Sequence, residues 1–184
     1  MRKQITLGLS ALAVAAATTI GMAQIRALNL GEMVDLADDA IHGTIVNSQV
    51  FRIDDPVDGP ELFFTTLTIE GRSMTTGDLT TVDVTFHGGF VSETEGVFNS
   101  EAPSKEDCKI GTPVVAFYGW QDNMGGGVAS NALMAAHGGL FRTIGAGDAE
   151  VVLGRGEGYA ISTNIRSNDL AGAIGRLHRA KLGR

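Results

Sequence analysis

The pattern of apolar and polar positions is clearest in residues 79–86. Val82, Val84 and Phe86 fall on one face there, and hydroxyl and carboxylate side chains fall on the other. This alternation is typical of a half-buried strand. Runs rich in β-branched and aromatic residues predict further strands at 40–51, 61–70, 113–120, 139–143, 149–153 and 159–165. The run 128–136 fits a strand and a helix equally well.

Helical spacing occurs near both ends of the chain. In residues 28–37 the apolar positions recur on one face, and Asn29 with Glu32 forms a capping-box pair at the start. A second apolar stripe follows residue 168, so Asn168 or Asp169 is expected to cap a closing helix. Basic residues near its end suit the helix dipole.

Turns and loops separate these elements. Residues 54–60 are acidic and rich in proline, and residues 71–78 and 122–127 read as turns. Residues 87–109 are polar with weak periodicity, so we expect a long irregular excursion, which is often functional. Together these elements predict a mainly β (α+β) domain, an antiparallel barrel or sandwich of about 6–8 strands, with a short N-terminal helix and a C-terminal helix.

The N-terminus has the layout of a secretory signal peptide. Arg2 and Lys3 precede an apolar run that ends in Gly21-Met22-Ala23, which predicts cleavage between Ala23 and Gln24. An uncleaved membrane anchor is the alternative, but the run is short and dominated by alanine. We therefore expect an exported protein, periplasmic or extracellular, with a β-barrel domain at 24–166 and the C-terminal helix at 167–184.

Charge and cysteine content limit the possible partners. Cleavage would remove 23 of 184 residues and two of 14 basic residues, leaving 161 residues with 12 basic against 21 acidic side chains, a formal charge of −9. This argues against nucleic acid, and against binding to membranes once the signal is removed. Cys108 is the single cysteine, so no intramolecular disulfide can form. We interpret it as a small, partly buried residue, with a reactive thiol as the alternative.

Several motifs resemble a widespread exported bacterial domain. Residues 30–46, with Leu30, Met33, Val34, Ala37 and Asp38 followed by Ile41 and Gly43, resemble its opening, "L-x-x-L-V-x-x-A-D" then "x-V-x-G-x-V", and similar loose resemblances occur at 77–89, 110–117 and 137–142. The resemblance implies a small OB-like or netrin/TIMP-like barrel and export, with no defined activity. Metalloprotease inhibition in that architecture uses an N-terminal cysteine and disulfides, which this chain lacks.

Histidines supply the main hypothesis for chemistry. His42, His87 and His137 lie at or near strand ends, with Asp83 four residues before His87. Imidazoles and a carboxylate of this kind can bind zinc or copper, but the spacing has no metal-site signature, and ordinary turn residues are the alternative. His178, on the closing helix, is expected to be exposed.

Other catalytic motifs are absent or incomplete. No G-x-S-x-G follows residue 23, so a serine hydrolase is not indicated. The glycine repeat at 154–158 does not open a helix, which argues against a nucleotide loop. The acidic loop 54–60 lacks EF-hand spacing. We therefore interpret it as a solvated loop, with a calcium site as the alternative.

The sequence therefore favours an exported, non-enzymatic binding or interaction domain for an unknown protein or small ligand. We expect the binding surface in the 87–109 excursion and in the 120–127 turn, with Tyr118, Trp120, Asp122 and Asn123 as candidate contacts. The alternative is a zinc- or copper-dependent protein or a cryptic enzyme that uses the strand-end histidines.

Overall fold

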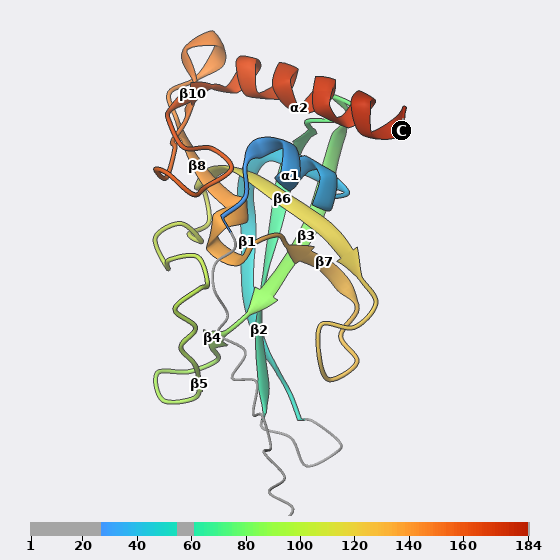
Figure 1. Ribbon diagram of the computed structural model, residues 1–184. Coiled ribbons are helices and arrows are strands. Elements are labelled where there is room, and N and C mark those ends of the chain that lie inside the picture. Colours follow the sequence, from blue (N-terminus) through green and yellow to red (C-terminus); the bar gives the residue numbers. More distant parts are fainter. Residues whose placement is uncertain (1–26, 55–60, 184) are drawn as a thin grey trace, which may run out of the picture.

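The computed structural model of the chain describes residues 27–54 and 61–183 (Figure 1). The predicted signal peptide at 1–23 lies outside these residues, as does most of the acidic loop at 54–60, including Asp55 and Asp58.

The short first helix, α1 (Leu30–Leu36), begins with the predicted capping box. The Asn29 side chain accepts a hydrogen bond from the backbone N–H of Glu32 at 3.0 Å, and the Glu32 carboxylate accepts one from the N–H of Asn29 at 2.9 Å. These two bonds satisfy donors that the first helical turn cannot. Met33 and Val34 then bury the helix face.

Five strands close into a barrel. They are β1 (Asp39–Ile53), β2 (Leu62–Ser73), β3 (Leu79–His87), β6 (Pro113–Gln121) and β7 (Ser130–Leu133). Their order is β1-β2-β3-β7-β6, and β6 pairs back with β1 to complete the ring. The ring pairings are antiparallel except for the parallel contact of β3 with β7. The predicted fold class, mainly β with a barrel and a helix near each end, is confirmed.

Shorter elements extend the barrel. The sheet continues from β6 through β8 (Leu140–Ile144), β9 (Val151–Val152) and β10 (Ile165–Arg166). A separate hairpin joins β4 (Gly89–Phe90) to β5 (Gly96–Val97), and two 3-10 turns cover Ala136–Gly139 and Gly147–Ala149. The chain ends in the helix α2 (Ser167–Leu182), which crosses the barrel beside α1 (Figure 1).

Strand β6 separates two hydrophobic cores. Val114 and Ala116 point into the barrel, where they join a cluster that includes Ile41 and Phe86. Val115 and Phe117 point the other way, into a second cluster covered by α1 and α2. Because both faces are buried, the strand reads as a continuous apolar run and not as an alternation.

Strands β1 and β2 approach closely where two glycines face each other. Gly43 is paired with Gly71 across the ladder. A Cβ atom on Gly43 would collide with the backbone carbonyl of Glu70, and one on Gly71 would collide with that of His42. This crossing therefore requires glycine on both strands.

The structure corrects three expectations and resolves one ambiguity. The predicted strand 159–165 is wrong: apart from Ile165, the first residue of β10, this region is irregular. The helix α2 begins at Ser167, and its N-cap residue, Arg166, makes no side-chain cap, so neither Asn168 nor Asp169 caps it. His178 is half-buried, not exposed. The ambiguous run 128–136 contains β7 and ends in left-handed backbone at Ala135 and Ala136.

Two of these corrections have a physical reason in the local contacts. Residues 154–164 make local contacts in place of a ladder, with the N–H of Arg155 bound to the carbonyl of Ile161 and the N–H of Gly154 bound to the side chain of Asn164. His178 lines a small gap between α2, α1 and β1, which shields it from water.

Among residues 27–54 and 61–183, no helix is both long enough and apolar enough to cross a bilayer.

Candidate functional site

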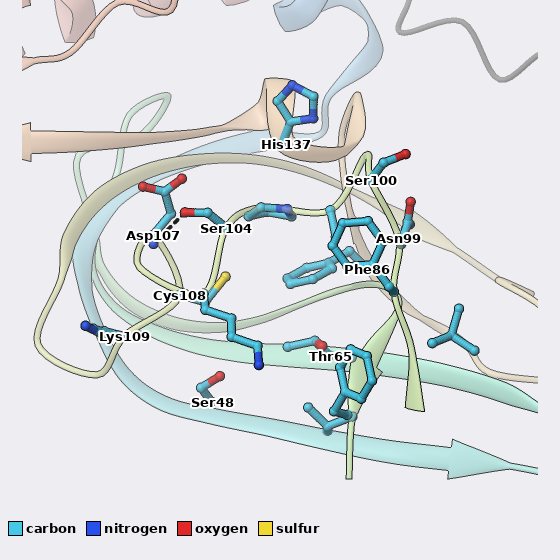
Figure 2. Close-up of a pocket in the computed structure, with 18 of the residues that line it drawn as sticks. Ser48, Thr65, Phe86, Asn99, Ser100, Ser104, Asp107, Cys108, Lys109 and His137 are labelled. Atoms are coloured by element: carbon cyan, nitrogen blue, oxygen red, sulfur yellow. Dashed lines mark hydrogen bonds between the residues drawn. The ribbon is translucent and has the colours of Figure 1, made fainter. Parts of the chain in front are cut away.

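A pocket of about 660 Å³ lies between the barrel and the segment that joins β3 to β6 (Figure 2). We call residues 88–112 the wall segment. In Figure 1 it runs along one flank of the barrel, away from α2. The barrel contributes Ser48 and Val50 of β1, Thr65 of β2 and Phe86 of β3 to the lining, and the wall segment contributes most of the remainder. A volume of this size is typical of sites for small organic ligands.

The barrel side of the pocket is an extension of the barrel interior. Phe86 lines the pocket and also belongs to the interior cluster. From the wall segment, Ala102 and Cys108 pack against that same cluster and also line the pocket. The wall segment therefore covers one end of the barrel and leaves the pocket beside it.

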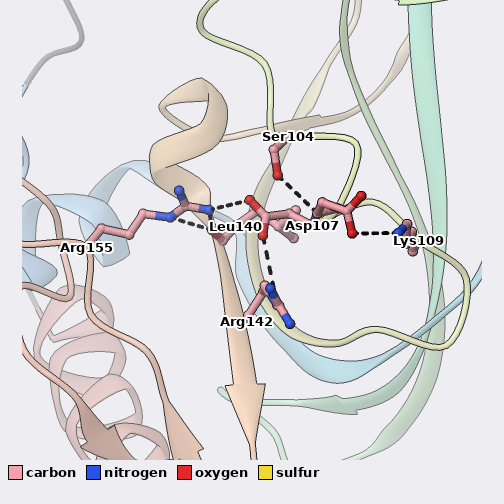
Figure 3. A network of polar contacts seen from close by, with 7 residues as sticks. Ser104, Asp107, Lys109, Leu140, Arg142 and Arg155 are labelled. Carbon is pink, nitrogen blue, oxygen red and sulfur yellow. Dashed lines mark hydrogen bonds and ion pairs between the residues drawn. The ribbon is translucent and has the colours of Figure 1, made fainter.

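Polar contacts hold the wall segment in place (Figure 3). The Arg155 guanidinium lies 3.2 Å from the Asp107 carboxylate, and that of Arg142 lies 4.0 Å from it. The Asp107 side chain is only 14% exposed, so water screens the pair with Arg155 less than it would a surface pair. At the other end, the Asn99 amide donates to the carbonyl of His87 at 3.0 Å.

Arg155 itself is held in place by strand β8. Its Nε and one terminal nitrogen donate to the carbonyl of Leu140, at 3.1 and 2.8 Å. Its guanidinium also lies over the Phe141 ring, 5.8 Å from the centroid, a favourable cation–π distance. One side chain from the loop after β9 therefore ties the wall segment to β8.

Apolar side chains of the wall segment face the pocket and remain partly open to solvent. Phe98 is 80% exposed and Ile110 is 65% exposed, and Phe90 and Val97 are exposed as well. All four line the pocket. Exposed apolar groups gathered at one place mark a ligand or interaction site more often than scattered ones do.

Cys108 lines the pocket and is partly buried. Burial, with a further contribution from the neighbouring Asp107, raises its pKa to about 12, although Arg155 acts in the opposite direction. A thiol with so high a pKa is almost entirely protonated near neutral pH and is a poor nucleophile. The partial burial fits the interpretation of Cys108 as a packed residue, and the reactive thiol stays the alternative.

His137 also lines the pocket, and its ring is held on both sides. Its Nδ1 lies 2.9 Å from the carbonyl oxygen of Glu101, and its Nε2 lies 2.9 Å from the Tyr159 hydroxyl. Because a carbonyl only accepts, Nδ1 carries the proton, and in the neutral ring Nε2 accepts from the tyrosine. This ring links the wall segment to the loop that contains Tyr159.

The other two predicted histidines have different neighbours. His42 lies 3.0 Å from the Glu150 carboxylate, which also accepts from the Thr143 hydroxyl at 2.7 Å. The His87 ring packs 4.8 Å from the ring of Phe64, and burial lowers its pKa. In the described part of the chain, no three His, Cys, Asp or Glu side chains are placed to hold a metal ion. The zinc or copper site at His42, His87 and His137 stays a prediction.

The predicted contacts at the end of β6 form a second, smaller feature. Trp120 is 56% exposed, and its indole N–H donates to Asp122 at 2.8 Å. The Asn123 side chain accepts from the N–H of Gly125 at 2.9 Å, which shapes the turn. Tyr118 packs against the barrel interior instead, and burial, together with Asp39 and Asp38, raises its pKa to about 12. None of these four residues lines the pocket.

The sequence pattern pointed to the excursion at 87–109 but did not identify the residues from other segments that complete the pocket. Ser48, Thr65 and Phe86 are ordinary strand positions, and Arg155 lies 48 residues from its partner Asp107. Glu150, the partner of His42, was also missed. No local sequence signal marks these contacts, because each depends on how distant segments meet.

Compared with protein-family models, with curated proteins and with solved structures, the chain gives no match.

Proposed function

We propose that this chain is an exported binding domain that holds a small, largely apolar molecule in the pocket between the barrel and the wall segment. The observation that carries the proposal is the cavity of about 660 Å³. Its lining is mostly apolar, with a few charged groups and amide and hydroxyl groups, which is the usual composition of a ligand pocket.

Export and family remain part of the same proposal. The N-terminal signal pattern, with cleavage between Ala23 and Gln24, supports a periplasmic or extracellular location. The closed five-stranded barrel supports an OB-like architecture and the resemblance to the exported bacterial domain. In OB folds the ligand face is formed by strands 2 and 3, and here Thr65 of β2 and Phe86 of β3 line the pocket.

Dye binding tests the proposal on the chain from residue 24 onward. Nile red is uncharged and fluoresces in apolar surroundings, so we expect a saturable signal with one site per chain. In Ser48→Trp the larger indole side chain would occupy part of the pocket, so the affinity for the dye should fall at least about tenfold. Gln49→Trp is the matched control, because neighbouring strand residues point to opposite faces and Gln49 is exposed.

Two results would contradict the proposal. One is unsaturable dye binding by the unaltered chain. The other is an equal loss in Ser48→Trp and Gln49→Trp when both variants melt at the unaltered temperature. Elemental analysis of the same preparation tests the zinc or copper alternative.

A further inference from the structure

The charge of the pocket lining is opposite to that of the whole protein. The chain carries a formal charge of −7. Among the residues that line the pocket, however, Lys105, Lys109 and Arg155 are cationic and only Asp107 is anionic. A cationic lining on an acidic protein creates a local field that attracts anions.

Two of these three cations already have carboxylate partners. Arg155 pairs with Asp107 at 3.2 Å, and Lys109 pairs with Glu106 at 2.5 Å. Lys105 differs from both: its ammonium lies over the ring of Phe90, 5.4 Å from the centroid. Within residues 27–54 and 61–183, Lys105 makes no ion pair. Its charge is therefore available to a ligand.

The apolar part of the lining continues directly from this cation. The ring of Phe90 contacts Lys105, and the other apolar residues of the lining include Val97 and Phe98 of the wall segment and Phe86 of the barrel. Such a surface suits a chain of methylene groups, and burial of each methylene is worth about a fourfold gain in affinity. A purely polar anion would leave these side chains exposed to water.

We infer that the pocket takes a single-chain amphiphile, with its alkyl chain against Phe86, Phe90 and Phe98 and one anionic headgroup at Lys105. This inference rests on the proposed function and adds the class of ligand. A carboxylate and a phosphate monoester share the required chemistry, because both accept hydrogen bonds from an ammonium.

Competition against Nile red tests the headgroup. The competitors are decanoate, decyl phosphate, decanol and decyltrimethylammonium, all below their micelle concentrations. From the displacement of the dye, we expect decanoate or decyl phosphate to bind with about fivefold higher affinity than decanol, which is the gain from one partly exposed ion pair. Decyltrimethylammonium should be the weakest, and the preference for anions should shrink as salt is added. Comparison of the two anions shows which headgroup is preferred.

A lysine variant assigns the effect to one residue. Lys105→Met keeps an apolar side chain of similar length and removes the charge, so the preference for anions over decanol should disappear while decanol binding stays within twofold. Arg176→Met, on the exposed face of α2, is the control for net charge, and it should keep the preference.

The outcomes separate the two proposals. Equal displacement by decanol and by both anions, with saturable dye binding retained, would overturn the anionic ligand and leave the apolar pocket standing. Loss of the preference in Arg176→Met, or its survival in Lys105→Met, would overturn the assignment to Lys105. Failure of the dye and of every decyl compound to bind would overturn both proposals.

Discussion

At the scale of residues, two neighbouring carboxylates have different surroundings. The Asp107 side chain is 14% exposed and lies between Arg142 and Arg155, whereas that of Glu106 is 68% exposed and pairs with Lys109. Ion pairs on the surface contribute little to stability, while a shielded pair that loses one partner leaves an uncompensated charge. The wall segment therefore depends on Asp107 far more than on Glu106.

Substitution of these two carboxylates tests that difference. We expect Asp107→Asn to lower the free energy of unfolding by about 1–2 kcal/mol, because Arg155 loses its charged partner. Glu106→Gln should change it by less than about 0.5 kcal/mol. Urea unfolding of both variants measures the values, and equal losses would show that Asp107 has no special role in holding the wall.

A second residue-scale prediction concerns acid. Burial raises the pKa of Glu150, but the hydrogen bonds from Thr143 and His42 outweigh burial, and the net pKa is lowered from its usual 4.5. The folded state therefore favours the ionised form. The resulting stability is fully present above the pKa of the unfolded chain and is lost as the pH falls through the lower pKa of the folded protein.

Melting at several pH values checks this sign. Between pH 7 and pH 3 the melting temperature of the unaltered chain should fall more than that of Glu150→Gln, which cannot lose a charge at this position. Parallel curves for the two proteins would exclude Glu150 as a source of acid sensitivity.

At the scale of elements, α2 acts as a cover for the outer face of β6. Ile174 is fully buried in the cluster that also contains Val115 and Phe117. Gly172, two residues earlier, is exposed, and a Cβ atom there would come no closer than 3.5 Å to the Arg176 side chain. In α2, therefore, the side chain of Ile174 fills the core, whereas Gly172 has no side chain although its surroundings leave room for one.

These two positions should respond in opposite directions. Ile174→Ala should cost about 2–5 kcal/mol, because it removes a fully buried side chain. Gly172→Ala should add about 0.5–1 kcal/mol, because alanine favours the helix. Denaturant unfolding measures both, and a destabilised Gly172→Ala would mean that the helix requires glycine there.

The sequence predicted elements well where a local pattern determines them. The alternation in residues 79–86 became β3 almost unchanged, and the capping box of Asn29 and Glu32 formed as expected. The strand expected at 159–165 failed: among the described residues of this segment only Ile165 pairs with another strand, β9, and Ile161 is buried in the cluster covered by α1 and α2. For the site, the irregular composition of 87–109 drew attention to the correct segment, but the barrel residues opposite it carry no distinguishing signal.

At the scale of the whole molecule, the barrel and the wall segment should differ in stability. Strand β6 is bonded on both sides and buried on both faces. The wall segment has one hairpin, made of two strands of two residues each, and a few side-chain contacts. Regions with few buried contacts open at lower free energy.

Hydrogen exchange followed by mass spectrometry measures this difference. Peptides from 89–100 should exchange at least about tenfold faster than peptides from β6, and saturation with a pocket ligand should slow the first set without changing the second. Equally slow exchange in both regions would show that the wall is as rigid as the barrel.

The wall segment is one continuous stretch of chain between β3 and β6. These barrel strands follow one another in sequence, although β7 lies between them in the ring. Insertions and replacements in such connections are tolerated more readily than changes in strands. A new stretch of a different length or composition, grafted between His87 and Ala102 so that Ala102, Asp107 and Cys108 keep their contacts, would present a new surface to the same barrel while the pairing of β1, β2 and β3 is retained. Under the proposed function, a library of variants in this one loop would change which ligands the pocket accepts while the barrel serves as a constant scaffold.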